Sequence, residues 1–147
     1  INTSKCNLIL FSSDSRREFV KSVFNVKIGL ENINFSQSCK LLGVTFDEKL
    51  RFTDHVKYIL KKCFLKLHAL YANRFVLNLN LRKILCESLI ISVFNYCSIL
   101  FYPCLDHITK NRLQVMQNNC VRLIFKLRKF DHVSSFYTIL NWYLFTS

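Results

Sequence analysis

The first third of the chain carries the alternation of apolar and polar side chains that is typical of half-buried β-strands. Apolar residues alternate with polar residues or glycine from residue 24 to 30 and again from 32 to 36, and Glu31-Asn32 is the expected turn of this hairpin. Shorter apolar runs before and after the hairpin predict two more strands, whereas the polar residues 15–22 predict a loop or a short helical turn. The expected strands are residues 6–11, 24–30, 32–36 and 40–46.

From residue 53 onward the apolar residues recur at the three- and four-residue spacing of an amphipathic helix. Thr53 is the expected N-cap, and Asp54 lies in the first turn, where a negative charge is favourable. The expected buried stripe is Val56, Leu60, Cys63, Leu67 and Leu70. The opposite side holds Lys57, Lys61, Lys62, Lys66 and His68.

A second helix is expected over residues 81–101 and is apolar nearly all round, which predicts the centre of a helical bundle. Pro103 is expected to end it. Residues 84–101 have about the length of a membrane span, but they include Glu87 and several serines and asparagines. A buried helix of a bundle therefore explains this segment better than a membrane span does.

A third helix is expected to begin at an Asp106 cap, and a last apolar segment covers residues 133–145. The predicted buried stripe of the third helix is Leu113, Met116, Cys120, Ile124 and Leu127. Its predicted outer face is Lys110, Gln114, Gln117, Asn118 and Arg122. The predicted fold class is thus α+β, with a small antiparallel β-sheet in residues 1–50 followed by a basic bundle of three to four helices in residues 51–147.

The charge is distributed unevenly between these two parts. The chain has a net charge of +12; residues 1–50 hold 7 basic and 5 acidic side chains, and residues 51–147 hold 14 basic and 4 acidic ones. A basic excess of this size implies an acidic partner, which can be nucleic acid, an anionic membrane surface or an acidic protein. The alternative is a charged, solvated surface that maintains solubility.

The sequence offers little that is typical of a catalytic or metal site. The seven cysteines are scattered and form no Cys-x-x-Cys pair, which argues against a zinc site and favours buried, reduced thiols. We therefore expect an intracellular protein, cytoplasmic or nuclear and not secreted. Asp47 and Glu48 are the only adjacent acids, they fall in an expected turn, and we predict no metal site and no cofactor. The lack of an initial Met and the apolar C-terminal end lead us to expect a piece of a longer protein.

Residues 39–56, CKLLGVTFDEKLRFTDHV, resemble a signature of reverse transcriptases of non-LTR retrotransposons of the jockey-like kind, YLGV-x-x-D-x-x-L-x-(W/F)-x-x-H-(I/V). The matching residues are Leu42, Gly43, Val44, Asp47, Leu50, Phe52, His55 and Val56, while Leu41 replaces the usual aromatic residue. Asn2 and Lys5 resemble the Asn-x-x-Lys strand of the family, and KIGLENIN resembles the hairpin that follows it. RLQVMQNNCVRLIF resembles a helix with a Gln-Asn pair, so the likeness covers nearly the whole chain.

The resemblance implies the end of a polymerase palm and a helical thumb. Lys5 would be the palm lysine near the leaving pyrophosphate, an auxiliary catalytic group. The strand with Leu42, Gly43 and Val44 would be the primer grip, where a glycine lets a nucleic-acid backbone approach; a strand bulge is the other explanation for Gly43. The nucleic-acid-binding lysines would be Lys57, Lys61, Lys62 and Lys66, although each of them could equally belong to a solvated helix face.

The sequence departs from the family at the catalytic centre. The Asp-Asp pair that holds two metal ions lies upstream of the Asn-x-x-Lys strand in the family, and this chain contains no Asp-Asp. The parent enzyme would use Mg²⁺, but this chain alone is predicted to be inactive as an RNA-directed DNA polymerase. The implied partners are a template–primer duplex and the upstream palm and fingers, without a membrane. The alternative is a non-enzymatic basic helical module that binds an acidic protein partner or a membrane surface.

Overall fold

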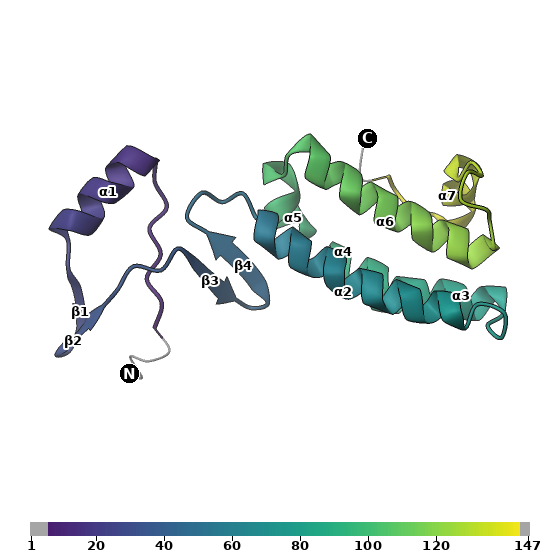
Figure 1. The fold of residues 1–147 in the computed structure, drawn as a ribbon, viewed down its shortest axis with the longest axis horizontal. Helices are drawn as coiled ribbons and strands as arrows, with labels where there is room; N and C mark the ends of the chain where they lie inside the picture. Colours follow the sequence, from purple (N-terminus) through teal and green to yellow (C-terminus); the bar gives the residue numbers. More distant parts are fainter. Residues whose placement is uncertain (1–5, 145–147) are drawn as a thin grey trace. The chain divides into compact units, whose positions relative to one another are not determined.

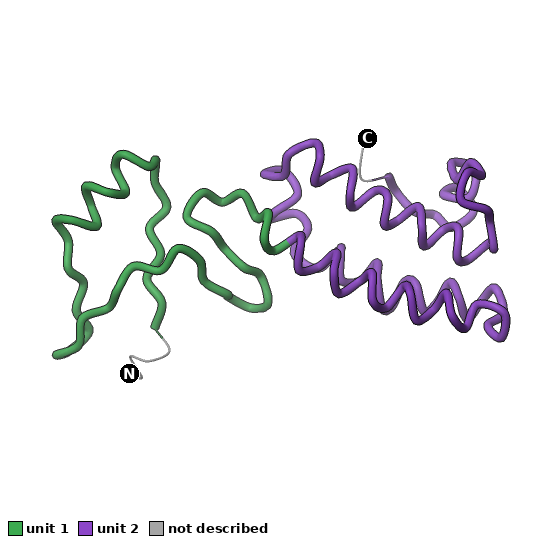
Figure 2. The backbone as a smooth tube through the Cα atoms, viewed as in Figure 1, with its two compact units in different colours: residues 1–55 green, residues 56–147 purple. Residues whose placement is uncertain are grey.

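The computed structural model describes residues 6–144, and the chain divides into two compact units, residues 1–55 and residues 56–147 (Figure 2). Within residues 6–144, strands occur only in the first unit and the second is helical, so the α+β prediction is confirmed at this level. The long helix α2 (Thr53–Ala72) begins in the first unit and continues into the second. The two units are described separately below.

The described part of the first unit contains α1, the start of α2 and two small antiparallel sheets of two strands each, rather than the single sheet predicted (Figure 1). Its elements are α1 (Asp14–Val23), β1 (Val26–Ile28), β2 (Glu31–Ile33), β3 (Ser38–Leu41) and β4 (Val44–Asp47). β1 pairs with β2, and β3 pairs with β4. Each pair is therefore a local hairpin, formed by neighbours in sequence.

Three of the strand predictions need correction. Residues 6–11 form no strand, and Leu8 makes only an isolated bridge with Phe35. The first hairpin turns at residues 29–30 instead of 31–32, because Gly29 adopts a positive φ of 63° that other residues disfavour. Residues 40–46 are not one strand but the two arms of the β3–β4 hairpin.

The second unit is built on two long helices, α2 and α6 (His107–Phe125), with shorter helical segments between and after them (Figure 1). These segments are α3 (Leu79–Cys86), the π-helical turn η2 (Glu87–Ile91), α4 (Ser92–Asn95), α5 (Ser98–Phe101), the 3₁₀ turn η3 (Tyr102–Cys104) and α7 (Ser134–Leu140). The predicted cap of the third helix is confirmed, because the Asp106 carboxylate accepts a hydrogen bond of 2.7 Å from the Thr109 amide.

The core of this unit follows the helical stripes closely. In α2 the buried positions are Val56, Ile59, Cys63, Leu67 and Leu70, so Ile59 takes the place predicted for the half-buried Leu60. In α6, Leu113, Met116, Cys120 and Ile124 are buried as predicted. The thiols of Cys63, Cys86 and Cys120 are free and fully buried.

The prediction of one central helix over residues 81–101 is wrong. The segment is interrupted by η2 and again at Cys97, whose φ of 55° is left-handed. The segment is only partly covered: α3 packs on α6, and Lys66 of α2 bonds the Leu89 carbonyl in η2, but several apolar side chains remain exposed. The exposed apolar residues are Leu81, Ile84, Tyr96, Ile99 and Leu100.

No single helix within residues 6–144 is long and apolar enough to cross a membrane. A bent pair, Leu79–Asn95 and Ser98–Cys104, reaches that length and composition only together, with a 41° bend between its parts.

The predicted outer face of α6 is partly a buried polar network. Gln114 and Gln117 are buried, and the Gln114 amide donates to the Tyr137 hydroxyl at 2.8 Å. Tyr137 in turn donates to the Asn118 side-chain oxygen at 2.6 Å, and Gln117 donates to the Tyr143 carbonyl at 2.9 Å. The amide side chains of α6 therefore hold α7 and the segment after it, which a helical-period count could not reveal.

Candidate nucleic-acid interface

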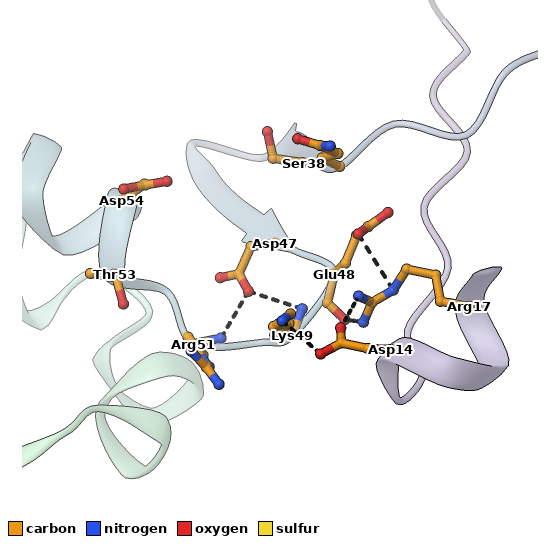
Figure 3. A pocket seen from close by; sticks show the side chains of 10 residues that line it. Asp14, Arg17, Ser38, Asp47, Glu48, Lys49, Arg51, Thr53 and Asp54 are labelled. Carbon is orange, nitrogen blue, oxygen red and sulfur yellow. Dashed lines mark hydrogen bonds and ion pairs between the residues drawn. The ribbon is translucent and has the colours of Figure 1, made fainter.

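Asp47 organises the junction between β4 and α2. Its carboxylate accepts hydrogen bonds from the backbone amides of Lys49 at 3.0 Å and Arg51 at 3.1 Å (Figure 3). A third bond, of 2.7 Å, comes from the Phe52 amide. The same loop holds Leu50 and Phe52 at positive φ values of 52° and 54°, which L-residues disfavour. The carboxylate thus stabilises a strained loop that leads the chain into α2.

His55 connects the first turn of α2 to the β3–β4 hairpin. Its side chain is buried, and its Nδ1 accepts a hydrogen bond of 3.3 Å from the Thr45 amide. Burial, with a smaller contribution from the Lys40 charge, lowers the pKa of His55 below its usual value of 6.5. Asp47 and His55, both part of the family-like signature, therefore have structural roles here.

The predicted primer-grip residues lie in a tight turn instead of a continuous strand. Leu41 pairs with Val44, so Leu42 and Gly43 are the two central residues of the β3–β4 turn. Both have positive φ values, 47° and 86°, as a type I′ turn requires, and this replaces the strand-bulge explanation for Gly43. Val44 is buried, whereas Leu42 is 82% exposed. An exposed leucine in a left-handed conformation is unusual, because Asn or Gly suits this position better.

The exposed side of α2 carries the predicted lysines. Lys57, Lys61 and Lys62 are exposed, and no acidic residue lies between residues 56 and 72. Lys66 differs from them: it is half-buried, and its Nζ donates to the Leu89 carbonyl at 2.9 Å. This bond joins α2 to the η2 turn, so Lys66 has a structural role in the helical unit.

An apolar groove lies between α2 and α6, next to the lysine side of α2. Its volume is about 600 Å³. It is lined by Leu60, Lys61, Phe64, Ile108, Asn111, Arg112, Val115 and Met116. Lys61 and Arg112 are its only charged residues among the described lining, so both charges at the groove are positive.

A second pocket, of about 510 Å³, lies in the first unit and has a mixed charge (Figure 3). Asp14 contacts Arg17 at 2.8 Å and Lys49 at 2.9 Å, and Glu48 pairs with both Arg17 and Lys21. Within residues 6–144, no group of three or more His, Cys, Asp or Glu side chains is arranged to hold a metal ion. These carboxylates instead hold α1 to the loop after β4.

Lys5, the auxiliary lysine implied by the family resemblance, lies outside the described residues. A basic and aromatic cluster at one end of the helical unit was missed by the sequence analysis. It joins Phe75, in the loop after α2, to Lys126, after α6, whose Nζ lies 5.6 Å from the Phe75 ring centroid. The basic run at residues 126–130 was visible in the sequence, but its neighbour 50 residues earlier could be found only from the structure.

A comparison of this chain with models of known protein families, with curated protein sequences and with solved structures finds no match.

Proposed function

We propose that this protein binds a nucleic-acid duplex through the exposed lysines of α2. The observation that carries the proposal is the side of α2 with Lys57, Lys61 and Lys62 exposed and no acid from residue 56 to 72. Beyond Asp54 in its first turn, α2 carries only basic charges, and such a helix on a strongly basic chain attracts the phosphate backbone independently of base sequence. Lys66 has no part in this surface, because its Nζ is engaged inside the unit.

The Leu42-Gly43 turn supports the same function. Holding Leu42 at positive φ costs roughly 1 kcal/mol relative to a residue that suits the turn. Burial does not compensate, because the side chain is 82% exposed. A strained and exposed apolar residue at the tip of a hairpin is typical of a binding position. Contact with a primer backbone, which the family resemblance implies for Leu42, Gly43 and Val44, would cover part of this exposed side chain.

The proposed activity is binding, without polymerisation. The likeness is to the end of the palm and the thumb of a reverse transcriptase of a mobile element, and the sequence has no Asp-Asp pair to hold two Mg²⁺ ions. We therefore expect duplex binding without nucleotide incorporation by this chain alone. Template-directed incorporation that survives repurification would refute this part of the proposal.

The test is a fluorescence-anisotropy titration of a labelled blunt duplex at several salt concentrations. Each phosphate contact contributes about 0.9 to the slope of log affinity against log salt, so the double variant Lys57→Glu/Lys62→Glu should reduce that slope by roughly 2. The matched control, Arg16→Glu/Lys27→Glu, makes the same charge change at exposed positions of the first unit. Equal losses in both variants would show that only net charge matters and would refute a defined α2 interface.

The apolar groove between α2 and α6 favours a second candidate function, the binding of an acidic amphipathic helix from a protein partner. Such a helix would place its apolar side against Phe64, Ile108 and Val115, and its carboxylates near Lys61 and Arg112. Phe64 and Ile108 are 58% and 67% exposed, which leaves apolar surface for a partner to cover.

Substitutions in the groove distinguish duplex binding from the binding of an acidic helix. Ile108→Ser/Val115→Ser alters the groove without removing a charge and should abolish binding of an acidic amphipathic peptide while duplex binding persists. If a scrambled peptide of the same composition binds equally well, the attraction is charge alone and the groove candidate fails.

A further inference from the structure

One end of the helical unit combines exposed aromatic rings with basic side chains from two separate loops. We name it the aromatic-basic tip; it consists of Arg74, Phe75 and Val76 after α2, and Lys126, Arg128, Lys129 and Phe130 after α6. Both loops lie at the same end of the unit (Figures 1 and 2). We propose that this tip binds single-stranded nucleic acid, stacking bases on Phe75 and Phe130 and pairing phosphates with the surrounding cations.

Each ring of the tip lies within the dimensions of one nucleotide from at least one cation. The guanidinium carbon of Arg74 lies 4.2 Å from the Phe75 ring centroid, and the Nζ of Lys126 lies 5.6 Å from the same centroid. The Nζ of Lys129 lies 5.5 Å from the Phe130 centroid. A base stacked on either ring would therefore have a cation close enough to meet its phosphate, and the Arg74 guanidinium plane can itself stack on a base.

The rings are open to solvent. Phe75 is 73% exposed and Phe130 is 87% exposed, so each retains free surface despite its cation contacts. Val76 beside them is 87% exposed. Aromatic side chains this exposed contribute little to folding, since the hydrophobic gain depends on area removed from water. A base on each ring would supply that burial.

Hydrogen bonds fix the backbone of both loops. The Arg74 guanidinium donates to the Tyr71 carbonyl at 2.8 Å, and Arg82 donates to the Arg74 carbonyl at 3.3 Å. After α6, Lys126 takes the left-handed cap conformation with φ 55°. The Arg128 amide donates to the Asp131 carboxylate at 2.7 Å. The Asp131 carboxylate thus stabilises the α6–α7 loop. Ordered loops lower the entropic cost of binding.

An anionic membrane surface is the other polyanion with which such a tip could interact. A membrane-inserting loop needs its apolar side chains to reach about 5–10 Å into the headgroup boundary while its cations stay above. Here the Arg74 charge lies 4.2 Å from the ring centre, so inserting Phe75 would bring this cation toward the apolar layer. Cations held over the rings, rather than set back behind them, match alternating bases and phosphates better.

The tip shares no residue with the α2 interface, so either proposal can fail alone. The test uses the full chain and a labelled single-stranded oligo(dT) of roughly 12 nucleotides, a length within the range of single-strand sites. The variant Phe75→Ala/Phe130→Ala should lose about tenfold or more in affinity for oligo(dT) while blunt-duplex affinity changes less than twofold. Phe75→Tyr/Phe130→Tyr should retain binding, because tyrosine keeps the stacking plane.

The matched control is Tyr143→Ala, which removes a ring that is 91% exposed on the segment after α7. It should leave oligo(dT) affinity unchanged, and circular dichroism should show that every variant keeps its helix content. Equal losses in the tip and control variants would overturn the proposal, as would oligo(dT) affinity that survives Phe75→Ala/Phe130→Ala. If Phe75→Ala/Phe130→Ala lost binding to phosphatidylserine vesicles but not to oligo(dT), the proposal would also be overturned, because a membrane surface would then be the ligand.

Discussion

The substitution Asp47→Ala tests whether one carboxylate holds the junction between β4 and α2. Asp47 accepts hydrogen bonds from the amides of Lys49, Arg51 and Phe52. Two of these bonds are exposed and the Phe52 bond is partly buried, so they contribute unequally. Taking about 0.5 kcal/mol for each exposed bond and about 1.5 kcal/mol for the partly buried one gives a loss of roughly 2.5 kcal/mol in the local opening free energy.

Removing the carboxylate also leaves the strain of the loop uncompensated. Leu50 and Phe52 remain at positive φ in the native loop, and this conformation favours opening once the hydrogen bonds are lost. The variant Asp47→Asn keeps one acceptor oxygen, so we expect roughly half the effect of Asp47→Ala. We therefore expect the local opening free energy to fall in the order wild type, Asp47→Asn, Asp47→Ala, and this order tests the reasoning more sharply than either value alone.

Hydrogen exchange measured by mass spectrometry reads this opening locally, without requiring the two units to unfold together. A loss of roughly 2.5 kcal/mol corresponds to amide exchange about 60-fold faster across residues 48–52, since each 1.4 kcal/mol is a factor of ten. Exchange in the middle of α6 should not change. Unchanged protection of residues 48–52 in Asp47→Ala would refute the role given to this carboxylate.

Three further predictions follow from the same contacts. The lowered pKa of His55 means that the unfolded chain takes up its proton first as the pH falls, so the stability that depends on neutral His55 should be full well above the usual pKa of 6.5 and decline as the pH falls below it. His55→Asn, which keeps an acceptor for the Thr45 amide, should flatten this pH dependence of the urea midpoint, and an unchanged slope would assign it to other groups. Leu42→Asn should stabilise the β3–β4 hairpin by about 0.5–1 kcal/mol in urea titrations yet weaken duplex binding, and tighter binding would contradict the proposed grip. Tyr137→Phe removes the hydroxyl between Gln114 and Asn118 and should cost about 1–2 kcal/mol of unfolding free energy; a neutral result would mean that the network contributes no net stability.

The sequence predicted best where local chemistry acts alone. The stripe of α2, the cap at Asp106 and the stripe of α6 depend on residues within a few positions of each other, and the structure confirms most of them. The exceptions are Leu60, whose place Ile59 takes, and Leu127, which is half-buried and lies beyond the end of α6. The first hairpin was also predicted, but its turn was placed two residues late. Gly29 was the signal for the correct position, because it is one of only two glycines and both have positive φ.

The sequence predictions were wrong where a local pattern is compatible with two structures, and only long-range packing decides between them. The apolar run around residues 84–101 suits a helix buried on every side, but its contacts with α6 and α2 leave Ile84 and Ile99 exposed. The amides of Gln114 and Gln117 suit a solvated face equally well, and they are buried because Tyr137 and Tyr143 supply partners from a later segment. Lys66 resembles the other lysines of α2 in sequence, and only the Leu89 carbonyl distinguishes it.

By itself, the sequence determined the α+β class, the positions of the two long helices and the basic excess of the helical part. These properties depend on periodicity and composition, which are carried by residues close together in the chain. Only the tertiary structure decided that the Leu42-Gly43 segment is a strained turn, that Asp47 is bound by three amides, and that Phe75 and Lys126 meet at one tip. Such features are contacts among particular side chains and loops, and their energies depend on geometry that no hydrophobic period encodes.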